Sequence, residues 1–199
     1  MKSYHYLLLS LLALVSTSNA AVSTGSLAPD FTLKDSTGAT HTLSSFKGKY
    51  VVLEWTNHRC PFVVKHYAKG DMQATQKALT SDGVIWLQIN SSAPGKQGHL
   101  TAADAEALRE SLNMESTAML LDESGEVGRT YDARTTPHMY LISPEGTLIY
   151  QGAIDSIKST RQSDVAKATN YVKAAYESAK AGKPIENATT TAYGCGVKY

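Results

Sequence analysis

Cys60 is the residue of this chain best placed to do chemistry. The apolar run at 50–55 (YVVLEW) predicts a buried strand, and Pro61 predicts that a helix begins directly after the cysteine. Cys60 would then be the N-cap, where free backbone N–H groups and the positive end of the helix dipole face its sulfur. Such surroundings favour the thiolate, which is the reactive form of cysteine. The alternative is a small buried cysteine that only packs.

Polar residues directly before Cys60 could assist a thiolate. His58 and Arg59 would add positive charge, and His58 could act as a base near neutral pH. Asn57 could offer its amide to a bound oxygen atom. For Asn57 the alternative is a turn residue, and for His58 it is a solvated loop histidine.

Cys195 is the only other cysteine among the 199 residues. It stands between Gly194 and Gly196, so we expect its backbone to adapt and the terminal tail to swing. Thiol–disulfide chemistry needs an attacking thiolate and a second thiol that resolves the product. Cys60 fits the first role and Cys195 the second.

The resulting hypothesis is a redox cycle between these two thiols. A peroxide or a disulfide substrate oxidises Cys60, Cys195 attacks it, and an external thiol reductant reopens the Cys60–Cys195 bond. The alternative is an inactive scaffold in which the same disulfide is only structural. Such a bond would close a long loop, and in the chain-entropy model it would stabilise the fold by about 5 kcal/mol.

Residues 1–20 have the pattern of a secretory signal peptide. Lys2 precedes a short apolar stretch at 7–15, and Ser18-Asn19-Ala20 ends in a small-x-small cleavage pattern. The stretch is too short for a comfortable membrane span, so we expect no stable membrane association after cleavage. Two cysteines are far too few for a disulfide-rich secreted scaffold.

Charge and length limit the possible partners and domains. The chain has 19 basic and 18 acidic residues and no run of like charge, so neither a nucleic acid nor an anionic membrane is an expected partner. The mature length suits a single domain with a proper core. We therefore divide the chain into a signal peptide (1–20), one domain (21–182) and a tail (183–199) that carries Cys195.

Hydrophobic patterning predicts the elements that position Cys60. The expected strands are 50–55, 84–90 and 118–122, the expected hairpins 31–43 and 138–152, and the expected helices 61–80, 102–112 and 164–181. This order predicts an α/β sandwich with a mixed central sheet and helices on both faces. In the first helix we expect Lys65 and Tyr67 to be solvated, and His66 to lie on the helix face.

Three segments carry a family resemblance. The run GSLAPDFTLKD (25–35) and the strand followed by WTNHRCP (55–61) match the lead-in and the reactive-cysteine position of one group of proteins. TTPHMYLI (135–142) is similar to the loop that places a cis proline opposite that cysteine, with Pro137 in this position. Together they resemble the thioredoxin-fold redoxins of the alkyl hydroperoxide reductase and thiol-specific antioxidant (peroxiredoxin-like) branch. The resemblance implies a thioredoxin-like fold and a thiol-based oxidoreductase, and we expect no cofactor.

The chain also departs from these families. Val63 stands where thioredoxins have their second cysteine, so a Cys-x-x-Cys cycle is excluded. Leu53 and Asn57 stand where peroxiredoxins usually have Pro and Thr, and Pro137 stands about where their peroxide-polarising arginine would fall. These departures leave peroxide and protein disulfides both open as the oxidant. With the signal peptide, the resemblance favours secretion or the bacterial periplasm.

A metal-binding protein is the rival hypothesis. Cys60 with His58, His66 or His138 could form a sulfur–imidazole site for copper or zinc. Exported copper chaperones with a thioredoxin fold are similar in architecture, although they normally use two nearby cysteines and a histidine.

Overall fold

The computed structural model describes residues 22–199, so the predicted signal peptide lies outside the described residues. The strands are β1 (Thr32–Asp35), β2 (Thr40–Thr42), β3 (Val51–Trp55), β4 (Ile85–Asn90), β5 (Ala118–Leu121), β6 (Thr135–Thr136), β7 (His138–Ile142), β8 (Leu148–Gly152) and β9 (Cys195–Gly196). The helices are α1 (Pro61–Tyr67), α2 (Asp71–Ser81), α3 (Ala102–Ser111), α4 (Glu126–Thr130) and α5 (Tyr171–Lys180), with 3-10 turns η1 (Leu43–Phe46) and η2 (Gln162–Lys167). Between residues 22 and 199, no helix is long and apolar enough to cross a membrane.

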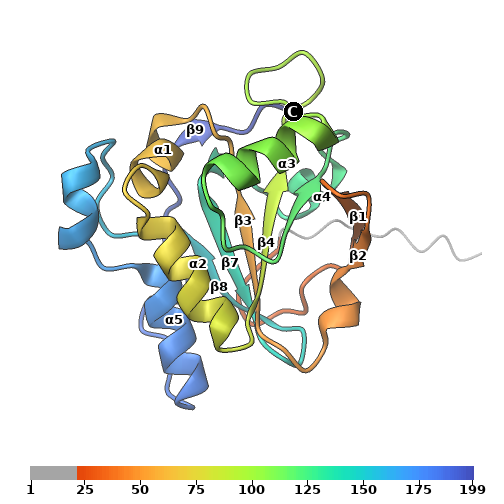
Figure 1. Ribbon diagram of the computed structural model, residues 1–199. Helices are drawn as coiled ribbons and strands as arrows, with labels where there is room; N and C mark the ends of the chain where they lie inside the picture. The colour runs from red at the N-terminus through yellow and green to blue at the C-terminus, as the bar shows by residue number, and fades with distance from the viewer. Residues whose placement is uncertain (1–21) are drawn as a thin grey trace, which may run out of the picture.

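Seven strands form one central sheet in the order β2-β1-β5-β4-β3-β7-β8 (Figure 1). The neighbours β3, β4 and β5 are parallel, whereas β7, β8, β1 and β2 pair antiparallel. Parallel neighbours require crossover connections. Helices α1 and α2 connect β3 to β4, and α3 connects β4 to β5. The prediction of a mixed sheet with helices on both faces is confirmed.

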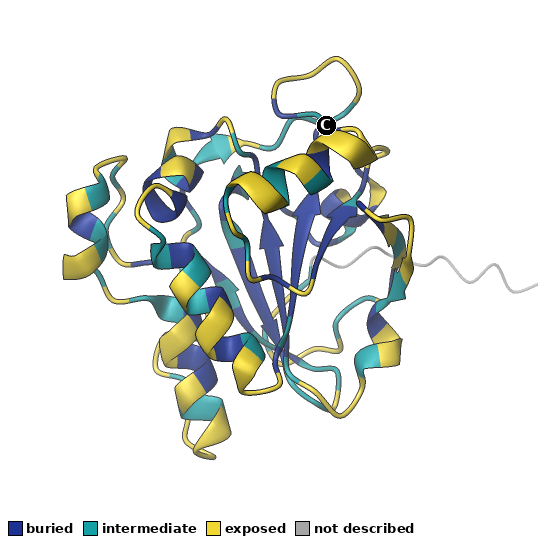
Figure 2. Ribbon diagram, viewed as in Figure 1, coloured by how far each residue is buried: buried dark blue, intermediate teal, exposed yellow. Residues whose placement is uncertain are grey.

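Two apolar cores flank the sheet because successive side chains of β3 point to opposite faces. Val52 packs with Trp86 against α1, α2 and α5. Leu53 and Trp55 pack on the other face, against α4 and η1. All five residues of β3 are buried, as Figure 2 shows for the centre of the sheet. The strand that leads to Cys60 is therefore held on both faces.

Two predicted helices are shorter than expected. The helix predicted at 61–80 is two helices, because Gly70 adopts a left-handed conformation (φ 83°) and starts α2 anew. The helix predicted at 164–181 is also interrupted, since Ala168 is extended and Asn170 caps α5 through its side chain. Gly70 indicates the first break in the sequence as a possible kink, whereas the apolar periodicity of 164–181 does not reveal the second.

The tail 183–199 lies docked on the body of the protein. Its strand β9 pairs antiparallel with β6, with Cys195 opposite Thr136 and Gly196 opposite Thr135. Figure 1 shows β9 beside the start of α1, at the carboxyl end of β3. The swinging tail expected from Gly194 and Gly196 is thus a paired strand in the structure.

Candidate functional site

Cys60 occupies the junction between β3 and α1. It is the N-cap of α1 with an extended backbone, and Pro61 is the first helical residue, as the sequence predicts. Its sulfur makes no capping hydrogen bond to α1. Instead Cys60 Sγ lies 3.1 Å from the carbonyl oxygen of Thr136, to which the thiol donates. The residue is fully buried, with 0% of its surface exposed.

Cys195 lies directly against Cys60. The backbone N–H of Cys195 donates to Cys60 Sγ at 3.4 Å, although the two residues are 135 positions apart. Both are free thiols in the structure, and Cys195 is partly exposed where Cys60 is buried. The structure therefore brings together the two cysteines that the sequence singles out.

The two thiols have opposite acidities. Burial opposes ionisation of Cys60, but hydrogen bonds from the side chain and backbone of Cys195 outweigh it, so the pKa of Cys60 lies below its ordinary value. Burial, together with the hydrogen bond to Cys60, raises the pKa of Cys195 to about 11. Of the two thiols, Cys60 is therefore the one that ionises more readily, and Cys195 is the donor to it. Cys195, rather than a capping bond in α1, is the main partner that favours the Cys60 thiolate.

The loop before β7 completes the wall around the sulfurs. The Thr136–Pro137 peptide bond is cis, and Thr136 provides the carbonyl that meets Cys60 Sγ. Gly194 passes so close to this carbonyl that a Cβ atom would collide with Thr136 O. Its φ of 144° also lies in a region that favours glycine. Gly196, in contrast, has no atom within 3.9 Å of a Cβ position.

Asn57, His58 and Arg59 form the loop that leads to Cys60. Asn57 is buried, and its amide is occupied by the loop itself, accepting from Arg59 N (2.9 Å) and donating to Gln97 O (3.2 Å). Of its two expected roles, the structure shows the turn residue. Arg59 is exposed, and no hydrogen bond joins His58 or Arg59 to Cys60 Sγ in the described chain. Burial and the nearby Arg59 lower the pKa of His58, which favours a neutral imidazole.

The residues proposed for a metal site do not converge. His138 pairs with Trp55 across the sheet, and its Nδ1 lies 3.1 Å from the Tyr140 hydroxyl. Burial lowers the pKa of His138 to about 4, so its imidazole is neutral near pH 7. Within residues 22–199, no group of three His, Cys, Asp or Glu side chains could hold a metal ion. The described site gives the metal-binding hypothesis no support.

Two residues expected to be solvated are buried. Tyr67 is 5% exposed and donates its hydroxyl to Glu54 at 2.7 Å. Glu54 is fully buried and needs donors, which Trp86 Nε1 also supplies at 2.8 Å. Lys65 has a fully buried side chain whose ammonium meets Asp155. The prediction for Lys65 and Tyr67 was wrong because their partners lie on other elements of the fold, for Lys65 about 90 residues or more away in the sequence.

The sequence also gave no role to the aromatic residues of the tail. Tyr193 is 6% exposed and contacts Lys65 and Asp155. Tyr199 donates its hydroxyl to Ala133 O at 2.6 Å, and Arg129 lies 4.5 Å above its ring. These two tyrosines flank Cys195 and hold the tail. Their presence in an otherwise small and polar tail is the one signal that could have indicated docking.

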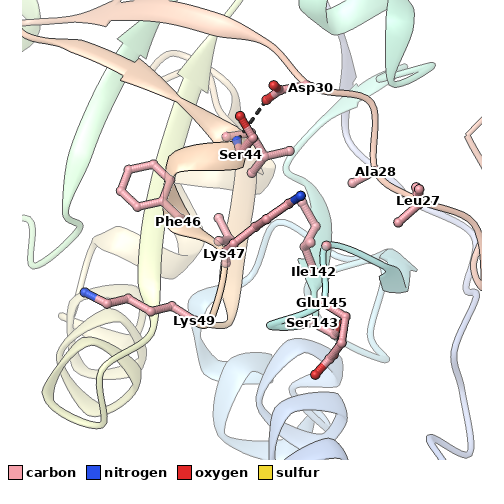
Figure 3. Close-up of a pocket in the computed structure, with 13 residues that line it drawn as sticks. Leu27, Ala28, Asp30, Ser44, Phe46, Lys47, Lys49, Ile142, Ser143 and Glu145 are labelled. Carbon is pink, nitrogen blue, oxygen red and sulfur yellow. Dashed lines mark hydrogen bonds between the residues drawn. The ribbon is translucent and has the colours of Figure 1, made fainter.

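Two pockets lie near the sheet ends. One, of about 220 Å³, lies beside the first residue of β3, at the opposite end from Cys60, and includes Leu27, Phe46 and Lys47 (Figure 3). None of its described lining residues is a cysteine or histidine. The other, of about 180 Å³, is mainly apolar, lies between α1 and α3, and has His58 in its wall. The second borders the loop that carries the thiol site, as does a more open hollow lined by His58 and Arg59.

The fold and the site together define a thioredoxin-like redoxin, a thiol-dependent oxidoreductase by class. The chain belongs to the AhpC/TSA family, whose model matches residues 24–151. This confirms the resemblance found in the sequence. No curated protein matched the chain.

Solved structures share the fold. A hypothetical protein from Sinorhizobium meliloti 1021 is 24% identical with a TM-score of 0.75, covering 90% of this chain and 96% of its own. An uncharacterized conserved protein from Geobacillus kaustophilus is 22% identical with a TM-score of 0.76, covering 96% and 98%. The thioredoxin domain of a thiol-disulfide oxidoreductase from Bacteroides vulgatus is 23% identical with a TM-score of 0.52, covering 74% and 98%. The last of these identifies the shared architecture as thioredoxin-like.

Proposed function

We propose that this protein is an exported thiol oxidoreductase whose redox centre is the Cys60–Cys195 pair. Cys60 is the attacking thiolate and Cys195 the resolving thiol. The observation that carries the proposal is the contact between them, with Cys195 N 3.4 Å from Cys60 Sγ and the two pKa values displaced in opposite directions. Export rests on the signal-peptide pattern at residues 1–20.

The chemistry balances in three steps. The Cys60 thiolate attacks a peroxide, takes one oxygen to become a sulfenic acid, and with a proton releases water or an alcohol. The Cys195 thiol then attacks the Cys60 sulfur, forming the disulfide and releasing the sulfenic oxygen as water. An external thiol reductant supplies two electrons and two protons, which return both cysteines to thiols.

Burial of Cys60 favours a small oxidant. Its surface is fully covered while the tail is docked, so hydrogen peroxide has a simpler approach than a protein disulfide, which would have to displace the tail. Thiol–disulfide exchange is the second candidate. It is favoured by the partial exposure of Cys195, whose sulfur a partner thiol could attack once the disulfide has formed.

Turnover of wild type and Cys60→Ser with hydrogen peroxide and with a protein disulfide tests the proposal. We expect wild type to turn over hydrogen peroxide with a thiol reductant, and mass spectrometry to find a Cys60–Cys195 disulfide after one equivalent of oxidant. Cys60→Ser should be inactive with both oxidants. Wild-type turnover in Cys60→Ser would eliminate the proposal, and turnover only with the protein disulfide would select the second candidate.

A further inference from the structure

A buried ion pair lies where the tail meets α1. The side chain of Lys65 is 0% exposed and that of Asp155 is 3% exposed, and Lys65 Nζ lies 3.2 Å from Asp155 Oδ2. Lys65 Nζ also donates to Ile157 O at 2.9 Å and to the Tyr193 hydroxyl at 3.1 Å. The Tyr193 hydroxyl in turn donates to Asp155 Oδ1. One tail residue thus contacts both buried charges.

Because the ion pair is buried, loss of any of its hydrogen bonds is costly. Removing two charges from water is costly, and the pair is tolerated only when hydrogen bonds satisfy the remaining donors and acceptors. The structure gives the Lys65 ammonium two hydrogen-bond acceptors, Ile157 O and the Tyr193 hydroxyl. Its contact with Asp155 Oδ2 is an ion pair, and that oxygen accepts no hydrogen bond from the described residues, so Tyr193 supplies half of the hydrogen bonding of the ammonium. Withdrawal of Tyr193 would leave the buried Lys65 ammonium without one hydrogen-bond acceptor and the buried Asp155 carboxylate without one donor. The ion pair therefore retains the tail at this point.

Packing restrains the Tyr193 ring as well. Lys65 Nζ lies 5.2 Å from the ring centroid, and Phe62 meets the ring edge-on at 5.7 Å between centroids. Phe62 and Lys65 both belong to α1, the helix that Cys60 caps. Tyr193 precedes Cys195 by two residues, about 7 Å of extended chain. The tail is thus fixed to the same helix that carries the attacking sulfur, close to the second thiol.

We propose that Lys65, Asp155 and Tyr193 form a positioning site that sets Cys195 against Cys60. The inference rests on the proposed redox role of the two cysteines. In the part of the chain that the structure describes, no hydrogen bond joins any of these three side chains to the sulfur of Cys60 or Cys195. They therefore act indirectly, by fixing the position of the tail. When the tail is fixed, the Cys195 thiol attacks Cys60 as an intramolecular partner at high effective concentration. A mobile tail lowers this effective concentration.

The molecule contains a matched control for this site. Tyr176 of α5 donates to Asp82, which also pairs with Lys180, so a second tyrosine–aspartate–lysine group exists at the far end of α2 and α5. Tyr193→Phe and Tyr176→Phe each remove one hydroxyl bonded to an aspartate. Only the first lies on the tail. Asp82 and Lys180 are partly exposed, so Tyr176→Phe should cost less stability than Tyr193→Phe, and a change in thiol pairing should follow only from Tyr193→Phe.

Two measurements test the inference in the full mature chain. The first is the equilibrium between dithiol and Cys60–Cys195 disulfide in glutathione buffers, followed by mass spectrometry. The second is the rate at which the Cys60 sulfenic acid converts to disulfide after a single addition of hydrogen peroxide. For Tyr193→Phe we expect both to fall by at least about tenfold, since one hydrogen bond to a charged group is worth that much and the substitution removes two. Tyr176→Phe should match wild type in both measurements.

The outcomes separate the two proposals. A Tyr193→Phe protein within twofold of wild type in both measurements, or a Tyr176→Phe protein with the same losses, would overturn the positioning site while leaving the redox pair intact. A wild-type protein that never forms the Cys60–Cys195 bond would overturn both proposals. Asp155→Asn provides a second variant that keeps the shape of the site but removes its negative charge. It should show losses at least as large as those of Tyr193→Phe.

Discussion

Cys60 and Cys195 are the same residue type in opposite surroundings. Cys60 is fully buried at the junction of β3 and α1, and the strand that leads to it is packed on both faces. Cys195 is partly exposed on a two-residue strand that depends on Tyr193 and Tyr199 for its place. The pKa of Cys60 is lowered, whereas that of Cys195 is raised to about 11. Hydrogen bonds from Cys195 thus make Cys60 the more acidic thiol in spite of its burial, while burial and the bond to Cys60 keep Cys195 protonated for the second step.

The largest effect should come from separating the two roles. Cys195→Ser should still be oxidised once at Cys60, but it should lose multiple turnover by about a hundredfold, because no intramolecular thiol resolves the sulfenic acid and the buried Cys60 is poorly accessible to the external thiol. A sulfenic-acid trapping reagent detected by mass spectrometry, together with steady-state turnover, measures both steps. A Cys195→Ser protein that keeps turning over at the wild-type rate would show that the tail cysteine has no part in the cycle.

The two glycines beside Cys195 give the next contrast. Gly194→Ala should displace β9, because its Cβ would collide with Thr136 O and its φ of 144° is strained for alanine. We expect disulfide formation to slow by about tenfold or more, as the held geometry is lost. Gly196→Ala is the control, since the atom nearest to its Cβ position lies 3.9 Å away. Equal rates for the two alanine variants would contradict the close approach at Gly194.

Removing the Cys195 donor should change the acidity of Cys60. In Cys195→Ala the side-chain hydrogen bond to Cys60 is lost, so the pKa of Cys60 should rise, whereas Cys195→Ser retains a donor and should show a smaller rise. Alkylation requires the thiolate, so its rate increases with pH through the pKa, and the midpoint should lie highest in Cys195→Ala. Thiolate absorbance against pH provides an independent titration. A midpoint in Cys195→Ala at or below that of Cys195→Ser would refute this account.

The smallest expected effect is at the far end of the tail. Tyr199→Phe loses the hydroxyl bond to Ala133 O (2.6 Å) but keeps the ring below Arg129. Alkylation of Cys60 in the folded protein should accelerate by about two- to tenfold, the range for one neutral hydrogen bond that closes an opening segment. The unfolding midpoint serves as the control and should stay close to that of wild type. Unchanged alkylation would mean that opening does not begin at Tyr199.

The fold could be predicted because its signals are local. The apolar run before Cys60, Pro61 after it, and the capping residue Thr101 of α3 each act on neighbours in the chain. The candidate site was only partly predictable from the sequence. The position of Cys60 followed from its junction, but the docking of Cys195 depends on the contact of Tyr193 with Lys65, 128 residues away. No local pattern encodes a contact of that kind.

The glycines illustrate the same limit. Gly-Cys-Gly in a terminal tail indicates a mobile backbone, yet Gly194 is required by the close passage of Thr136 O and a positive φ. The sequence alone does not distinguish a glycine that makes the backbone flexible from one that allows a close approach of another backbone. Likewise, Lys65 was expected in solvent because its buried partner, Asp155, is remote. Long-range packing overrode the surface preference of lysine in this case.

The 135-residue separation of the two cysteines also has a consequence during synthesis. At a typical elongation rate, the ribosome would need roughly 10–30 s to add the residues that separate Cys195 from Cys60. During that time the nascent chain contains Cys60 but not yet Cys195, its intramolecular disulfide partner in the proposed cycle. Any oxidising species met in that interval would find a lone sulfur, so protecting nascent chains from premature oxidation should raise the yield of correctly paired protein.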